Sequence, residues 1–136
     1  MGVFVEKRWK SMNQILVLSE DQDYFSNISK TIQSLDHFEI HIFKNNLELI
    51  NYSLTNYSQL VILDLDILKS ETFEMIQILR SLHSDTKIAL FLSSENMPIC
   101  SEVLSFGLLS YQIKPVSTES TLKIISSTFQ IEIPSE

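Results

Sequence analysis

Leu60-Val61-Ile62-Leu63-Asp64 is a short apolar run that ends in a carboxylate. Runs of this length, rich in branched side chains, are typical of strands that are buried on both faces of a parallel sheet. Similar runs occupy residues 15–18 and 88–92. Charged residues follow the strand-like segments, with Glu20 after the first and Lys114 after the last. Because open α/β sheets build their sites at the carboxyl ends of the strands, these charges predict where the function lies.

Five strand-like segments alternate with five helical ones. The segments at residues 38–42 and 109–113 alternate apolar and polar residues, as half-exposed strands do. Each helical segment repeats apolar residues every three or four positions, which predicts one buried face per helix. The repeating residues are Phe25, Ile28, Ile32 and Leu35, then Leu47, Ile50 and Leu54, then Phe73, Ile76 and Leu79, then Ile99, Val103 and Phe106, and finally Leu122, Ile125 and Phe129. The alternation predicts a doubly wound, flavodoxin-like α/β domain whose five-stranded parallel sheet has the order 2-1-3-4-5, with the half-exposed strands at its edges.

A single domain accounts for most of the chain. Its 136 residues, 44% hydrophobic and 20% charged, have the composition of an ordinary globular protein and are enough to bury a core. We expect the domain at residues 13–130. Residues 1–12 are expected to be a flexible leader, in which Met12 is a possible natural start and residues 1–11 an upstream remnant. Residues 131–136 are expected to be a tail or the start of a linker.

The composition also argues against several classes of function. The net charge of -7 argues against direct binding of nucleic acid, because neutralising phosphates requires a basic surface. No apolar stretch reaches the roughly 18 residues of a membrane helix. The single cysteine, Cys100, fits a reducing compartment, so we expect a cytoplasmic protein. Two glycines, Gly2 and Gly107, cannot form a phosphate-binding loop or a dinucleotide turn, which excludes NTPases, kinases and NAD enzymes.

The charged strand ends predict a site for phosphoryl transfer. In a sheet of this order the first and third strands are neighbours, so Glu20 and Asp64 should face each other across a crevice, joined by Ser93 and Lys114. A carboxylate can attack phosphorus to give an acyl phosphate. Mg²⁺, bound by carboxylates, a backbone carbonyl and water, would offset the repulsion between the two anions. Lys114 would add fixed positive charge, and Ser93 a hydroxyl donor.

In this respect the chain resembles the receiver domains of bacterial two-component response regulators, the CheY-like superfamily. The resemblance extends from about Asn13 to Phe129. The matching pieces are residues 15–20 for the first strand and acidic pocket, 61–64 for the phosphoacceptor strand, 92–94 for the strand that ends in Ser or Thr, Gly107, and 111–115 for an aromatic residue followed by Lys-Pro.

The resemblance implies a role for each matching residue. Asp64 would be the phosphoacceptor and a metal ligand. Glu20 would bind Mg²⁺ directly, and Asp66 would contribute its backbone carbonyl. Ser93 and Lys114 would assist the transfer.

The resemblance also implies partners. Ser93 and Tyr111 would relay phosphorylation to a face built from the fourth helix, the fifth strand and the fifth helix. A histidine kinase or phosphotransfer protein would donate the phosphoryl group, and an output domain or partner protein would bind that face; a homodimer is also compatible. The domain would be a signalling module rather than an enzyme, because it catalyses only its own phosphorylation and dephosphorylation.

The chain departs from the family pattern near the site. Ser19 takes the place of the first of two usual acids, which should weaken Mg²⁺ binding. Residues 65–72 lack the usual proline and glycine. Ser19, Asp21 and Glu95 are expected around the pocket, where Glu95 and Asp66 would flank the path of an attacking water.

Two alternatives remain open. A degenerate receiver, acting as a constitutive protein-interaction module, is favoured by Ser19 and the unusual loop after Asp64, but the presence of Glu20, Ser93 and Lys114 argues against it. A metal-dependent phosphatase on a related α/β fold would need additional acids and usually a cap domain, for which 136 residues leave no room.

Overall fold

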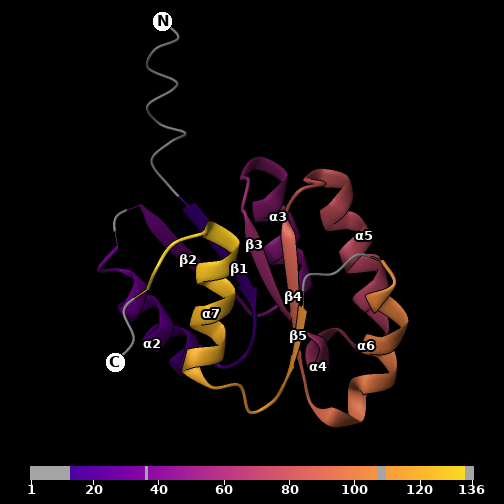
Figure 1. Ribbon diagram of the computed structural model, residues 1–136. Helices are drawn as coiled ribbons and strands as arrows, with labels where there is room; N and C mark the ends of the chain where they lie inside the picture. Colours follow the sequence, from indigo (N-terminus) through magenta and orange to yellow (C-terminus); the bar gives the residue numbers. More distant parts are fainter. Residues whose placement is uncertain (1–12, 36, 107–109, 134–136) are drawn as a thin grey trace, which may run out of the picture.

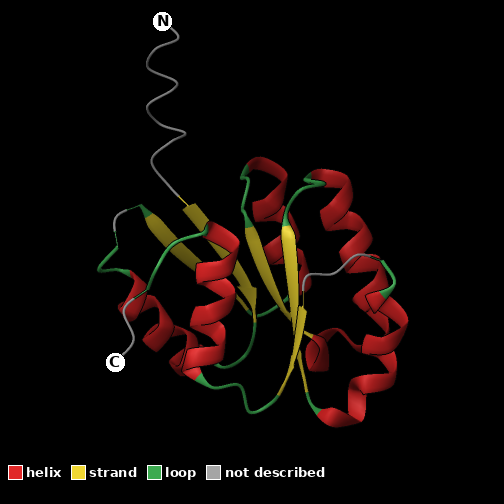
Figure 2. Ribbon diagram, in the orientation of Figure 1, coloured by secondary structure: helices red, strands yellow, loops and turns green. Residues whose placement is uncertain are grey.

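The computed structural model describes residues 13–35, 37–106 and 110–133. Five parallel strands of this part form one sheet in the order β2-β1-β3-β4-β5, which confirms the predicted order (Figures 1 and 2). The strands are β1 (Asn13–Leu18), β2 (Phe38–Phe43), β3 (Leu60–Asp64), β4 (Lys87–Leu92) and β5 (Ser110–Ile113). The half-exposed strands β2 and β5 lie at the two edges, also as predicted. The expected leader, Gly107 and the end of the expected tail lie outside the described residues.

Helices cover both faces of the sheet (Figure 1). On one face lie α2 (Gln22–Ile32) and α7 (Thr118–Phe129), and on the other lie α3 (Asn46–Thr55), α5 (Thr72–Leu82) and α6 (Met97–Leu104). These five helices match the five predicted ones and complete a doubly wound α/β domain. Among the helices of the described ranges, none is both long and apolar enough to cross a membrane.

The strand β3 stabilises both layers because all of its residues are buried. Alternate side chains of a strand point to opposite faces. Val61 and Leu63 therefore belong to the core beneath α3, α5 and α6, whereas Leu60 and Ile62 belong to the core beneath α2 and α7. Full burial of a Leu or Ile side chain contributes about 1.5–3 kcal/mol. This packing fixes the position of the last strand residue, Asp64, at the carboxyl edge of the sheet.

The predicted buried face of α3 is wrong, although the helix itself is present. The sequence period placed Leu47, Ile50 and Leu54 on that face, but Leu47 and Leu54 are 70% and 58% exposed. The helix instead buries Leu49 and Ser53, with Ile50 partly buried beside them. Because apolar residues occur on more than one side of this helix, periodicity alone does not select the face that packs on the sheet.

The loop after β3 contains helical structure. It forms α4 (Leu65–Leu68) and a 3₁₀ turn, η1 (Lys69–Glu71). The Asp64 carboxylate caps α4, since it accepts a hydrogen bond of 2.9 Å from the backbone N–H of Asp66. Both leucines of α4 are buried. The lack of proline and glycine in this loop is consistent with a helical turn, which holds Asp66 close to the sheet edge.

Two leucines of α3 provide a matched test of this packing. Leu49→Ala removes a fully buried side chain and should lower the free energy of unfolding by about 2–5 kcal/mol, through lost burial and the cavity left behind. Leu47→Ala makes the same chemical change at an exposed position and should change it by less than about 0.5 kcal/mol. Urea denaturation of both variants measures the difference, and equal losses would contradict the packing of α3.

Candidate functional site

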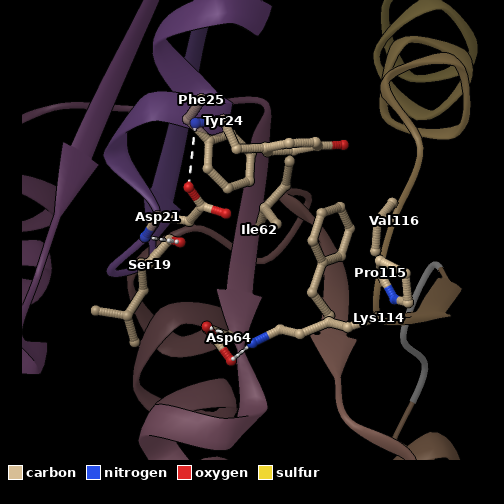
Figure 3. Close-up of a pocket in the computed structure, with 11 residues that line it drawn as sticks. Ser19, Asp21, Tyr24, Phe25, Ile62, Asp64, Lys114, Pro115 and Val116 are labelled. Atoms are coloured by element: carbon tan, nitrogen blue, oxygen red, sulfur yellow. Dashed lines mark hydrogen bonds and ion pairs between the residues drawn. The ribbon is translucent and has the colours of Figure 1, made fainter.

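An ion pair joins the ends of two strands at the carboxyl edge of the sheet. The carboxylate of Asp64, at the end of β3, is 10% exposed. Lys114 directly follows β5, and its side chain extends past the end of β4 to Asp64 (Figure 3). Its Nζ atom lies 2.8 Å from each carboxylate oxygen of Asp64. The backbone N–H of Lys114 donates to the carbonyl of Leu92, which fixes the start of this side chain relative to β4.

A second carboxylate completes the arrangement. Asp66 Oδ2 lies 2.9 Å from Lys114 Nζ. The backbone N–H of Ser93 donates to both oxygens of Asp66, at 3.0 and 3.1 Å, and the Ser93 hydroxyl donates to Oδ2 at 2.7 Å. The side-chain amide of Asn96 donates to Oδ1 at 2.6 Å. Asp64, Asp66, Ser93, Asn96 and Lys114 thus form one connected network, which we call the lysine cluster.

The contacts within the lysine cluster shift two pKa values. Burial by itself would raise the pKa of Asp66, but the hydrogen bonds from Ser93, Asn96 and Lys114 outweigh it and hold that pKa well below its usual range. Burial would likewise lower the pKa of Lys114, but its contacts with Asp64 and Asp66 raise it above the ordinary lysine value. At neutral pH, therefore, Asp66 is a carboxylate and Lys114 is an ammonium.

The residues after β1 lie at the same edge of the sheet. Ser19 is buried, and its hydroxyl accepts a hydrogen bond of 2.9 Å from the backbone N–H of Asp21. The Asp21 carboxylate in turn caps α2 by accepting from the backbone N–H of Tyr24 at 3.1 Å. Glu20, between them, is exposed. The two polar side chains that flank Glu20 are therefore used to start α2.

A pocket of about 440 Å³ opens beside Asp64 (Figure 3). Its polar lining comes from Ser19, Asp21, Asp64 and Lys114, and most of the remaining wall is apolar or aromatic, including Phe25 and Phe91. Ser19 and Asp21 are among the residues that line this pocket, whereas Glu20 and Glu95 are not.

The structure brings together three residues that the sequence predicts as partners, namely Asp64, Lys114 and Ser93. Ser93 joins the cluster through its hydrogen bonds to Asp66. Tyr111 on β5 is 38% exposed, and Glu95 is exposed in the 3₁₀ turn η2 (Ser94–Asn96). Both of these residues therefore lie at the surface.

The sequence did not predict the places of two side chains in the lysine cluster, those of Asp66 and Asn96. The side chain of Asp66 was expected beside a water path, whereas its carboxylate lies at the centre of the lysine cluster. Asn96 was not predicted at all. Its only signal in the sequence is its position three residues after Ser93, which matches the 2.9 Å hydrogen bond from the Asn96 N–H to the Ser93 carbonyl. That turn places the Asn96 amide within reach of Asp66.

The residues expected to hold Mg²⁺ do not form a carboxylate-rich site in this arrangement. Both oxygens of Asp64 accept from Lys114, the Asp66 carboxylate is engaged within the lysine cluster, and Ser19 supplies no charge. In the described ranges, no group of three or more His, Cys, Asp or Glu side chains is placed to hold a metal ion. Because Mg²⁺ requires several hard oxygen ligands, this donor set does not fit the ion without rearrangement.

Several solved structures that share this fold are response regulators or receiver domains. A response regulator from Thermotoga maritima superposes with a TM-score of 0.74 at 18% identity, covering 88% of this chain and 98% of that one. The non-phosphorylated HemR receiver domain of Leptospira biflexa gives a TM-score of 0.73 at 16% identity, with 91% and 99% covered. The chemotaxis response regulator CheY4 of Vibrio cholerae gives 0.71 at 18% identity, with 87% and 99% covered. The chain therefore has the fold of a CheY-like receiver domain, which confirms the fold that the sequence resemblance implied.

Similarity at the level of sequence is confined to a shorter segment. The terminal-differentiation-specific adenylate cyclase of Dictyostelium discoideum is 33% identical over 76 residues, which make up 56% of this chain and 4% of that protein. The chain thus spans only a small part of this relative's length. No family model matches the chain.

Ser19 allows the expected metal site to be tested. Ser19→Asp adds a carboxylate to the pocket that Asp64 lines. A carboxylate at roughly 4–6 Å from a divalent ion, at an effective dielectric of about 20, is worth about 6–8 kcal/mol before desolvation. Desolvation of the two ions cancels most of this energy, so we expect Mg²⁺ to bind about tenfold more tightly. Isothermal titration calorimetry measures this change. The control Ser81→Asp adds the same charge at an exposed position near the end of α5 and should have no effect. Unchanged affinity in Ser19→Asp would exclude a metal site beside β1.

Proposed function

We propose that this domain is the phosphoacceptor receiver of a two-component response regulator, with Asp64 as the residue that is phosphorylated. The observation that carries the proposal is the ion pair at the carboxyl edge of the sheet. It holds a largely buried carboxylate 2.8 Å from a lysine ammonium, beside an open pocket. In this geometry the Asp64 carboxylate is a nucleophile that a phosphodonor can reach through the pocket. The Lys114 ammonium is a fixed cation that balances the negative charge gained on phosphorylation.

The proposed reaction is a displacement at phosphorus. One carboxylate oxygen of Asp64 attacks the phosphorus of a phosphohistidine and forms the P–O bond of an acyl phosphate. The P–N bond of the donor breaks, and its electron pair remains on the imidazole. Hydrolysis ends the signal. Water attacks the phosphorus of the acyl phosphate, the bond between phosphorus and the Asp64 oxygen breaks, and inorganic phosphate leaves. Lys114 stays beside the reacting carboxylate throughout, and Ser93 is the nearest hydroxyl donor of the lysine cluster.

The proposed partners follow from this role. The donor would be a cytoplasmic histidine kinase or phosphotransfer protein, and an output domain or partner protein would bind the face of α6, β5 and α7. Large apolar side chains exposed on or beside α6 and β5 support this choice of face. They are Leu104, Phe106, Tyr111 and Ile113. The domain would act as a signalling module and not as an enzyme on other substrates.

A constitutive protein-interaction module, the degenerate receiver, is the second candidate. The position of Asp66 favours it, because this carboxylate already engages Ser93 and Lys114 without any phosphoryl group. The two candidates differ in one measurable property, which is whether Asp64 accepts a phosphoryl group.

Phosphorylation by acetyl phosphate at millimolar Mg²⁺ tests the proposal. We expect intact-mass analysis to show the addition of one phosphoryl group to the wild type. Asp64→Asn should show no addition, because the neutral amide is a poor nucleophile. Circular dichroism should show that this variant is folded.

Asp85→Asn is the matched control. It makes the same change at an exposed position in the turn before β4, at the opposite edge of the sheet, and should be phosphorylated like the wild type. Failure of the folded wild type to gain a phosphoryl group, or equal gain in Asp64→Asn, would rule out the proposed phosphoacceptor.

A further inference from the structure

The hydrogen-bond donors around Asp66 form a binding site for an anion. We propose that the Asp66 carboxylate is an internal ligand of this site, and that a phosphoryl group added to Asp64 must displace it. The inference rests on the proposed function of Asp64. It implies that the Asp66 carboxylate slows the phosphorylation of Asp64.

The site around Asp66 is built from donors of three separate segments. The backbone N–H and hydroxyl of Ser93 come from the end of β4, the Asn96 amide from η2, and the ammonium of Lys114 from the end of β5. The contacts to Asp66 range from 2.6 to 3.1 Å. Such a set of converging donors, with one full positive charge, recognises a carboxylate or a tetrahedral oxyanion.

The hydroxyl and ammonium donors of this site are already fully used. The Ser93 hydroxyl has one proton, and it is directed to Asp66 Oδ2. The Lys114 ammonium has three protons and contacts three carboxylate oxygens, two on Asp64 and one on Asp66. A second anion therefore cannot obtain these hydrogen bonds while Asp66 remains in place.

The Asp66 side chain can leave the site without unfolding the loop. Its backbone N–H is held by the Asp64 carboxylate at 2.9 Å, so α4 stays capped when the side chain rotates. The Asp66 side chain is 24% exposed, compared with 10% for Asp64, which gives it a path toward solvent. Displacement thus requires only a rotation of one side chain together with the loss of its hydrogen bonds.

The consequence is a competition between two anions for the same donors. In the unphosphorylated protein Asp66 binds Ser93, Asn96 and Lys114. A phosphoryl group on Asp64 would lie close to the same Lys114 ammonium. Its oxygens must accept the hydrogen bonds from Lys114 and from the Ser93 hydroxyl that Asp66 accepts in the unphosphorylated protein. Removing the Asp66 carboxylate should therefore speed phosphorylation and open the site to free phosphate.

Three variants of the full chain test this competition. Asp66→Ala empties the site, and Asp66→Asn keeps the volume of the side chain but removes its charge, which provides a second variant if the alanine variant is unstable. Glu102→Ala is the charge-matched control, since it removes an exposed carboxylate from α6, outside the lysine cluster and the pocket. It accounts for the general repulsion between this acidic chain and an anionic donor.

Two measurements are made on each variant. The first is the rate of phosphorylation by acetyl phosphate, where we expect at least a roughly tenfold increase in Asp66→Ala, a smaller increase in Asp66→Asn, and a change below about twofold in Glu102→Ala. The second is a titration with inorganic phosphate followed by amide NMR. The Ser93 and Asn96 signals should shift at millimolar phosphate in Asp66→Ala and not in the wild type.

The outcomes distinguish this inference from the proposed function. A phosphorylated wild type whose Asp66 variants show neither a faster rate nor phosphate binding would overturn the inference and leave the phosphoacceptor role intact. Phosphate binding by Asp66→Ala without phosphorylation of any variant would support the internal ligand and reject the phosphoacceptor. An equal gain in rate for Glu102→Ala would also overturn the inference, because it would show that the effect of the Asp66 variants comes only from the change in net charge of the protein.

Discussion

The position of one ammonium group between two carboxylates governs the chemistry of this domain. Asp64 and Asp66 are separated by a single residue, and both carboxylates lie at the edge of the sheet within 2.9 Å of Lys114 Nζ. Without that cation, two ionised carboxylates so close together would repel each other, and one of them would tend to take up a proton. The lysine can reach them because β5 is two strands away from β3 and its end is hydrogen-bonded to the end of β4. The sheet order is thus a precondition for the site.

The residues that follow β1 are not part of the lysine cluster. Ser19 and Asp21 are used to start α2, and Glu20 is exposed. The positive charge at this edge comes from Lys114, which contacts both carboxylates of the lysine cluster. A phosphoryl group at Asp64 would add negative charge in the same place, so its stability depends on how the donors of Ser93 and Lys114 are shared. The arrangement of these donors, rather than the identity of Asp64 alone, determines what the site can do.

Much of the fold was predictable because a strand that is buried on both faces has a continuous run of apolar residues in the sequence. The runs that became β1, β3 and β4 are apolar without alternation, and the period of Phe25, Ile28 and Ile32 selected the correct buried face of α2. The face of α3 was not predictable in the same way, because only contact with the sheet distinguishes Leu49 from Leu47. Asp64 and Lys114 were predictable as partners from their places at strand ends. The role of Asp66 was not, because it depends on a side-chain orientation set by α4 and by the η2 turn that carries Asn96.

Ser93, Asn96 and Lys114 hold Asp66 as a carboxylate. The pH titration of the Asp66 carboxyl carbon by ¹³C NMR tests this arrangement directly. We expect a pKa well below the ordinary aspartate value of about 3.9, because the hydrogen bonds to the ionised form outweigh its burial. In Lys114→Met the pKa of Asp66 should rise, since the cation is gone while Asp64 remains nearby. A wild-type Asp66 that titrates near 3.9, with no change in Lys114→Met, would show that Ser93, Asn96 and Lys114 do not hold its carboxylate.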